Sequence, residues 1–301
     1  MASKNRCYLA DGGPAKPPRL TERRPGPNNA REMDKGGSVP ARARLPAALA
    51  PIVVVAGMYA MAWLAPYAFA LGLRPALAIS EMALIAPGVL ALAAFRVPLA
   101  AGLGLNPIRS RTALFVAAAA GALWVASLGL FEVQYALWAP PPGYLEQFQR
   151  LHEALRPHSP ADALLSVVAI AAVPAICEEL LLRGIVLPSL LPALGGAGAI
   201  ATSAALFALI HWDLYRAAFT FTLGVALGIL RVRSGSLLAP ILAHALVNTI
   251  TFVAAPFTED PSGGLPEPRP LLGLAMLAAG TGLTFLLMHR VGVVDSTQVD
   301  A

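Results

Sequence analysis

Two adjacent carboxylates and an arginine lie within one of the most apolar stretches of the sequence, "AICEELLLRG" at 175–184. A charged side chain at the centre of a membrane helix costs about 2.5–3.5 kcal/mol on insertion scales, so such residues usually face the protein interior and carry a function. In a helix, Glu179 and Arg183 are four residues apart, in the acid-first order that favours an ion pair. Glu178 is rotated by about 100° and is free to face a cavity. We therefore expect Glu179 and Arg183 to support the structure and Glu178 to do the chemistry.

Two further apolar stretches carry polar pairs at the same spacing of four residues. "FALIH" at 207–211 places Phe207 and His211 on one helix face, and "HALVN" at 244–248 does the same for His244 and Asn248. A carboxylate and an imidazole together can take a proton from water and so make a nucleophile. A second histidine and an amide can donate hydrogen bonds to the oxyanion of an attacked carbonyl. This set of groups is typical of a site that hydrolyses peptide bonds.

The elements that must position these groups are membrane helices. Of the 301 residues, 57% are hydrophobic and only 13% are charged, well below the ~25% of a soluble domain. Several apolar runs reach the ~20 residues that cross the bilayer core. The sequence predicts an all-α, polytopic membrane helical bundle with a central polar cavity. It has about eight transmembrane helices, near 46–72, 76–95, 112–139, 162–187, 197–211, 215–231, 237–256 and 270–289.

Four regions follow from this pattern. Residues 1–45 hold ten of the 22 lysines and arginines, in a Pro- and Gly-rich stretch that we expect to be a disordered, basic, cytoplasmic tail. Residues 46–139 form the first transmembrane helices, 140–256 the catalytic core, and 257–301 the last transmembrane helix and a short tail. Within the core, apolar residues at helical spacing between 140 and 160 predict a short interfacial helix.

The net charge of +5 arises mainly from this tail, so no nucleic-acid partner is expected. Cys7 and Cys177 fall in different regions and predict no disulfide. Two other carboxylates, Glu81 and Glu132, lie near the ends of their predicted segments. We interpret both as solvated helix edges, where a carboxylate reaches the headgroup region.

The three motifs together resemble the type II CAAX prenyl endopeptidase family, also called CAAX-protease and bacteriocin-processing (CPBP) intramembrane proteases. The family motifs EExxxR, FxxxH and HxxxN match "EELLLR" (178–183), "FALIH" (207–211) and "HALVN" (244–248), in order and in separate helices. The resemblance covers roughly residues 140–256. It implies a glutamic-type endopeptidase of the membrane that forms no covalent acyl-enzyme.

The resemblance also implies a role for each matched residue. Glu178 would be the general base, and His211 would help to activate the water. His244 and Asn248 would form the oxyanion site. The residues that would hold the helices in place are Glu179, Arg183 and Phe207.

Three other interpretations remain open. A zinc-dependent version of the same protease would use Glu178, His211 and His244 as ligands, because two histidines and a glutamate with an open position form a known catalytic set. The family implies a site without metal or other cofactor, and the chain lacks an HExxH motif. A non-catalytic immunity or scaffold protein of the same fold would not need all four polar residues of the site. A proton-coupled transporter is disfavoured, since the sequence shows no inverted repeat.

The expected partners are the lipid bilayer and a membrane-anchored or hydrophobic peptide substrate. The Ala-, Arg- and Pro-rich composition is typical of a GC-rich bacterial genome, which argues against prenylated substrates. We therefore expect an integral protein of a bacterial cytoplasmic (inner) membrane, with its N-terminus in the cytoplasm.

Overall fold

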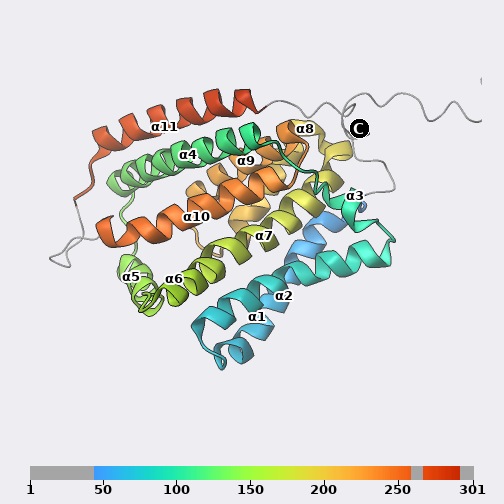
Figure 1. Cartoon of the computed structure of the whole chain (residues 1–301), viewed down its shortest axis with the longest axis horizontal. Helices are drawn as coiled ribbons and strands as arrows, with labels where there is room; N and C mark the ends of the chain where they lie inside the picture. The colour runs from blue at the N-terminus through green and yellow to red at the C-terminus, as the bar shows by residue number, and fades with distance from the viewer. Residues whose placement is uncertain (1–43, 259–266, 292–301) are drawn as a thin grey trace, which may run out of the picture. The chain divides into compact units, whose positions relative to one another are not determined.

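The computed structural model describes residues 44–258 and 267–291, and within these ranges it is all-helical, without a strand (Figure 1). The expected basic tail, apart from Arg44 and Leu45, and the residues after 291 lie outside the described part. The helices are α1 (Leu49–Phe69), α2 (Leu73–Ala94), α3 (Leu99–Leu103), α4 (Ser110–Leu137), α5 (Tyr144–Ala154), α6 (Pro160–Val167), η3 (Val168–Ala172), α7 (Val173–Glu179), η4 (Leu180–Val186), α8 (Leu187–Ile210), α9 (Ala217–Ser234), α10 (Leu238–Thr258) and α11 (Pro270–Arg290). The predicted fold class is confirmed.

Seven helical stretches in the described residues are long and apolar enough to cross a membrane, which indicates an integral membrane protein. The sequence predicted about eight, because it divided the residues 160–210 into two segments. The structure runs helix through this whole stretch of 51 residues, which as one straight helix would reach about 75 Å.

A break at Gly195 divides this long stretch into two helices that pack on one another. Gly195 has φ 67° and ψ 176°, a backbone conformation that glycine adopts readily because it lacks a Cβ. After the break the chain turns back, since the Ser203 hydroxyl donates a hydrogen bond of 3.1 Å to the Leu182 carbonyl oxygen. The expected segments 162–187 and 197–211 are therefore both present. The structure has seven stretches where the sequence predicted eight because these two segments are joined without a non-helical loop.

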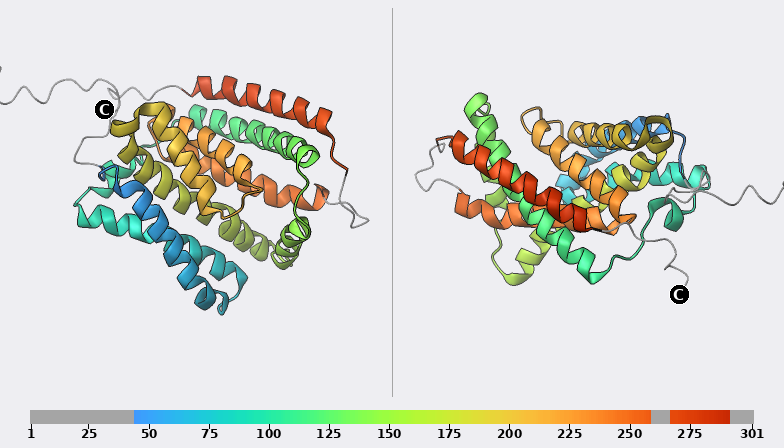
Figure 2. Two further views of the ribbon diagram at one scale, coloured as in Figure 1. Left: turned by 180° about the vertical axis from the view of Figure 1, so that it is seen from behind. Right: turned by 90° about the horizontal axis from the view of Figure 1, so that it is seen from above.

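The middle of the bundle is the continuous helix α6–η3–α7–η4, which carries the EExxxR motif. In Figures 1 and 2, α7 lies between α10 on one side and α2 on the other. Two π-helical segments, η3 and η4, flank α7. Pro174 lies in the first turn of α7, where its missing N–H leaves the preceding turn without one backbone hydrogen bond. Such π-helical segments occur often at functional sites.

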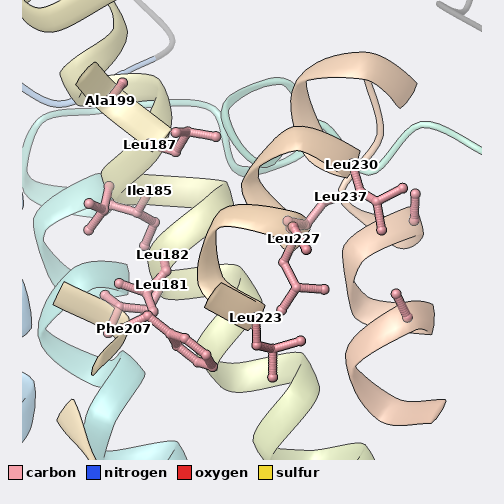
Figure 3. Packing of buried hydrophobic residues seen from close by; sticks show 14 of the residues in the cluster. Leu181, Leu182, Ile185, Leu187, Ala199, Phe207, Leu223, Leu227, Leu230 and Leu237 are labelled. Carbon is pink, nitrogen blue, oxygen red and sulfur yellow. The ribbon is translucent and has the colours of Figure 1, made fainter. Parts of the chain in front are cut away.

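Apolar side chains lock η4 against its neighbours. Leu181, Leu182 and Ile185 are almost fully buried and pack with Phe207 of α8 and with the leucines of α9 (Figure 3). Interiors packed to this density resist small displacements, because side chains that interdigitate have few alternative positions. The backbone beside Glu178 and Glu179 is therefore held by a cluster of fully buried apolar side chains.

The short helix expected between residues 140 and 160 is present as α5. The Tyr144 hydroxyl donates a hydrogen bond of 2.7 Å to the Asp213 carboxylate in the α8–α9 connection. On the same face, the Phe148 ring lies 5.4 Å from the Arg216 guanidinium carbon. His152 stacks on Phe252 of α10. Helix α5 thus contacts the connection that follows His211 and the helix α10 that carries His244.

Candidate active site

The EExxxR motif forms a buried ion pair inside the bundle. The Arg183 Nη1 donates to the Glu179 Oε1 at 2.8 Å, and both side chains are fully buried. The Arg183 Nη2 also donates to the Gly224 carbonyl oxygen of α9 at 2.7 Å. A buried ion pair needs such additional hydrogen bonds to offset the loss of hydration. The structure therefore confirms the pairing of Glu179 with Arg183, and it adds a link from this pair to α9.

The His244 ring of α10 lies next to the carboxylates of both Glu178 and Glu179. Its Nδ1 donates to the Glu179 Oε1 at 3.0 Å, while its Nε2 lies 3.8 Å from the Glu178 Oε2. The sequence did not indicate the contact with Glu179, because it assigned that carboxylate to Arg183 alone. Since Glu179 accepts from two donors, the carboxylate fixes the orientation of the His244 ring and turns the other nitrogen toward Glu178.

Phe207 contacts residues of all three motifs. Its ring is fully buried and lies 4.8 Å from the Arg183 guanidinium carbon. The His211 and His244 rings meet its ring edge to face, with centroids at 4.9 and 5.5 Å. A guanidinium over an aromatic face is held by the ring quadrupole. Phe207 therefore contacts residues of both η4 and α10 from its place on α8.

His211 ends α8 and lies at the edge of this cluster. Its Nδ1 donates to the Phe207 carbonyl oxygen at 2.8 Å. Burial and the neighbouring Arg216 guanidinium lower the pKa of His211 to about 4, so its ring is neutral near pH 7. With the proton on Nδ1, the Nε2 lone pair is left as a hydrogen-bond acceptor.

Some of the predicted site residues are in direct contact, and others are not. Glu178, Glu179, Arg183 and His244 are in direct contact, whereas His211 reaches the others through Phe207. Asn248 follows His244 by one turn of α10 and is partly buried. Among the described residues, no group of three or more His, Cys, Asp or Glu side chains is close enough to hold a metal ion. The alternative zinc set is therefore not assembled as ligands in this arrangement.

Two residues near the site were missed by the sequence interpretation. Arg216, in the connection after α8, interacts electrostatically with both Glu178 and His211. Glu81 is not a solvated helix edge, because it is the ninth residue of α2 and its Oε2 is buried without a hydrogen-bond partner. The expectation for Glu81 was wrong because α2 begins at Leu73, one turn before the predicted segment, and turns this face toward α7. For Glu132, whose Oε2 accepts from the Arg269 backbone N–H, the position near a helix end is confirmed.

Burial of two adjacent carboxylates beside an imidazole favours chemistry over architecture. The exposed fraction of Glu178 is 7% and that of His244 is 3%. The Oε2 of Glu178 is buried without a hydrogen-bond partner, and buried polar groups without partners are rare and often functional. The Oε2 of Glu179 is also buried without a partner, but its Oε1 accepts hydrogen bonds from both Arg183 and His244.

Comparison with known proteins covers the segment that builds this cluster. The family model of the Rce1-like type II CAAX prenyl endopeptidases matches residues 160–250. These residues run from the start of α6 into α10 and include all three motifs. No curated protein and no solved structure matches the chain. Residues 160–250 of this chain are therefore similar to the type II CAAX prenyl endopeptidase family, and this matched segment includes the three motifs on which the resemblance was predicted.

Proposed function

We propose that the protein is an intramembrane endopeptidase that hydrolyses peptide bonds with a water molecule activated by Glu178. The observation that carries the proposal is the pair of neighbouring carboxylates in different environments. The Glu179 Oε1 accepts hydrogen bonds from Arg183 and His244, whereas the Glu178 Oε2 lies 3.8 Å from the His244 Nε2 and has no hydrogen-bond partner. Two such carboxyl groups have different roles when their environments differ.

In the first step, Glu178 takes a proton from water as the water oxygen attacks the carbonyl carbon. The neutral His211, at the C-terminal end of α8, supports this step as a second proton acceptor through its Nε2 lone pair. Because the water itself is the nucleophile, no bond forms between the protein and the substrate. This distinguishes the reaction from a serine or cysteine protease.

The oxyanion that forms in this step requires hydrogen-bond donors. His244 donates from Nδ1 to Glu179, and as an imidazolium it also donates from Nε2 to the oxyanion. Asn248, one turn along α10, adds an amide donor. Donors fixed before the reaction stabilise the transition state strongly, since no reorganisation is needed when the charge develops. Glu179, Arg183 and Phe207 hold these groups in position.

The substrate class is a membrane-anchored or hydrophobic peptide in the bilayer, and the compartment is a bacterial cytoplasmic membrane. The family match supports the peptide substrate, and the seven apolar helical stretches support the location in a membrane. The proposed site needs no metal ion. Activity should therefore survive exhaustive chelation, and elemental analysis of the active protein should find no stoichiometric zinc.

The proposal is tested in cells of the source bacterium that carry either the wild type or Glu178→Ala. Membrane-anchored precursors should accumulate with the variant and mature with the wild type, as measured by mass spectrometry of the membrane fraction. Arg150→Ala, an exposed substitution on α5, is the matched control. Equal processing of every precursor by the wild type and Glu178→Ala would show that the protein is not this protease.

A further inference from the structure

A third acidic residue, Glu81 of α2, lies beside the site that the three motifs define. Its Oε2 is buried without a hydrogen-bond partner, as is the Oε2 of Glu178. The two carboxylates interact electrostatically, and Glu81 also interacts with the Cys177 thiol. None of the three motifs includes Glu81, because it comes from a helix outside the matched segment 160–250.

Packing between α2 and the central helix α6–η3–α7–η4 shows which part of that helix lies beside Glu81. A Cβ on Gly88 would lie 2.9 Å from the Ile185 Cδ1 and 3.2 Å from the Leu181 Cδ1, so the two helices touch there. Gly88 follows Glu81 by seven residues, which is two turns on the same face. Leu181 and Ile185 similarly follow Glu178 by three and seven residues. Near the start of α2, Arg74 donates a hydrogen bond to the Ser166 hydroxyl of α6, so the two helices run in the same direction. Glu81, between these two contacts, therefore lies beside α7, the helix that carries Glu178.

The arrangement places Glu178 between two different partners. On the α10 side lies the Nε2 of His244, at 3.8 Å from the Glu178 Oε2. On the α2 side lies Glu81, since α7 separates α10 from α2 (Figure 1). A peptide bond over Glu178 with its carbonyl oxygen toward His244 therefore has its nitrogen on the α2 side.

We propose that Glu81 is a second catalytic carboxyl group, which donates a proton to the nitrogen that leaves when the peptide bond breaks. This inference rests on the proposed function. Two carboxyl groups close together in a water-poor site share one proton, because both do not ionise side by side. Glu178 is then the carboxylate that acts as the base, and Glu81 is the carboxylic acid.

The proton balance of the reaction closes with these two groups. Water gives one proton to Glu178, and its oxygen bonds to the carbonyl carbon. When the oxyanion collapses, the C–N bond breaks, and the nitrogen takes its electron pair and the proton from Glu81. The products are a carboxylic acid and an amine. Glu178 now holds a proton and Glu81 is ionised, and transfer of that proton to Glu81 restores the starting state.

Dependence on the leaving group tests this role. The probes are a peptide that contains the cleavage site of a precursor processed by the wild type, and an aryl ester of its acyl half. A phenolate can leave as the anion and needs no proton, whereas the nitrogen of a peptide bond must be protonated before it leaves. Glu81→Gln should lower the ratio of kcat/KM for the peptide to that for the ester about 100-fold. Glu81→Asp keeps an acid one methylene further back, and it should lower the ratio less.

Glu178→Gln is the control for the proposed function, and it should lose both reactions. If Glu81→Gln lowers both reactions equally, or neither, Glu81 is not the proton donor, even though Glu178 remains the base. If Glu81→Gln does not fold in detergent, an unchanged ratio in Glu81→Asp overturns the inference. If Glu178→Gln cleaves the peptide as fast as the wild type, the proposed function itself is wrong.

Discussion

The α4–α11 pair and the α7–α10 site both join helices within the apolar part of the chain, but with different groups. Between α4 and α11 the backbones touch: a Cβ on Gly129 would lie 2.4 Å from the Leu277 nitrogen, and one on Gly280 would lie 2.5 Å from the Ala126 nitrogen. Between α7 and α10 the contact is polar, through His244 and the two carboxylates.

The difference shows two ways of holding helices together in a lipid bilayer, which is as apolar as most of their side chains. Close backbone approach gains dispersion contacts and needs only small residues. A buried polar contact is strong only when each group is paired, so it tolerates almost no substitution. The glycine interface can therefore serve stability alone, whereas the polar interface also supplies reactive groups.

The largest effect on stability should come from breaking the polar interface at its ion pair. Arg183→Met leaves the Glu179 carboxylate buried with only His244 as a hydrogen-bond donor, and it removes the hydrogen bond to the Gly224 carbonyl oxygen. We expect a loss of about 3–5 kcal/mol in the free energy of unfolding, measured by denaturation in detergent. Arg150→Met, on the exposed side of α5, is the control. If both variants are equally stable, the ion pair is not what holds the site.

A smaller loss should follow from a methyl group in the glycine interface. Gly280→Ala forces its Cβ against the backbone of α4, whereas Gly282→Ala, on the same helix, meets nothing within 4 Å. Overpacking of this kind typically costs about 1–3 kcal/mol, so Gly280→Ala should unfold at a lower temperature than Gly282→Ala. Because α11 contributes no residue to the site, the folded fraction of both variants should keep wild-type kcat. Equal melting temperatures would contradict the close packing of α4 and α11.

The edge of the site should respond to pH through His211. Its pKa is lowered to about 4 from 6.5 in the unfolded chain, so below pH 6.5 the unfolded state binds a proton that the folded state does not. Stability should therefore fall as the pH drops from 7 to 5, by up to about 2 kcal/mol from this residue. His211→Asn should show a smaller fall in melting temperature over the same range. An equal pH dependence in both proteins would place His211 in solvent.

The smallest effect should come from the contact between α5 and the loop after His211. Tyr144→Phe removes the hydrogen bond to Asp213, which also accepts from the Arg216 backbone N–H. One such bond contributes about 0.5–1.5 kcal/mol. Burial and the Asp213 carboxylate both raise the pKa of Tyr144, so the hydroxyl stays protonated as the donor. The melting temperature of Tyr144→Phe should fall slightly, whereas Tyr59→Phe, at an exposed position, should not change it.

The polar interface could be predicted from sequence to a greater extent than its surroundings. The ion pair of Glu179 with Arg183 followed from their spacing, because four residues bring two side chains together in one helix. The contact of His244 with Glu179 joins residues 65 positions apart, and no local spacing indicates it. The environment of Glu81 was predicted wrongly, because the distance of a residue from the end of its helix does not show which neighbouring helix it faces.

The most direct test of the central claim is whether cleavage depends on the Glu178 carboxylate. Wild type in liposomes should cleave a membrane-anchored precursor, and no acyl-enzyme should be trapped when the reaction is quenched during turnover. Glu178→Gln should form no product, although it binds the same precursor. Cleavage by Glu178→Gln at the wild-type rate would contradict the assignment of Glu178 as the base that activates water.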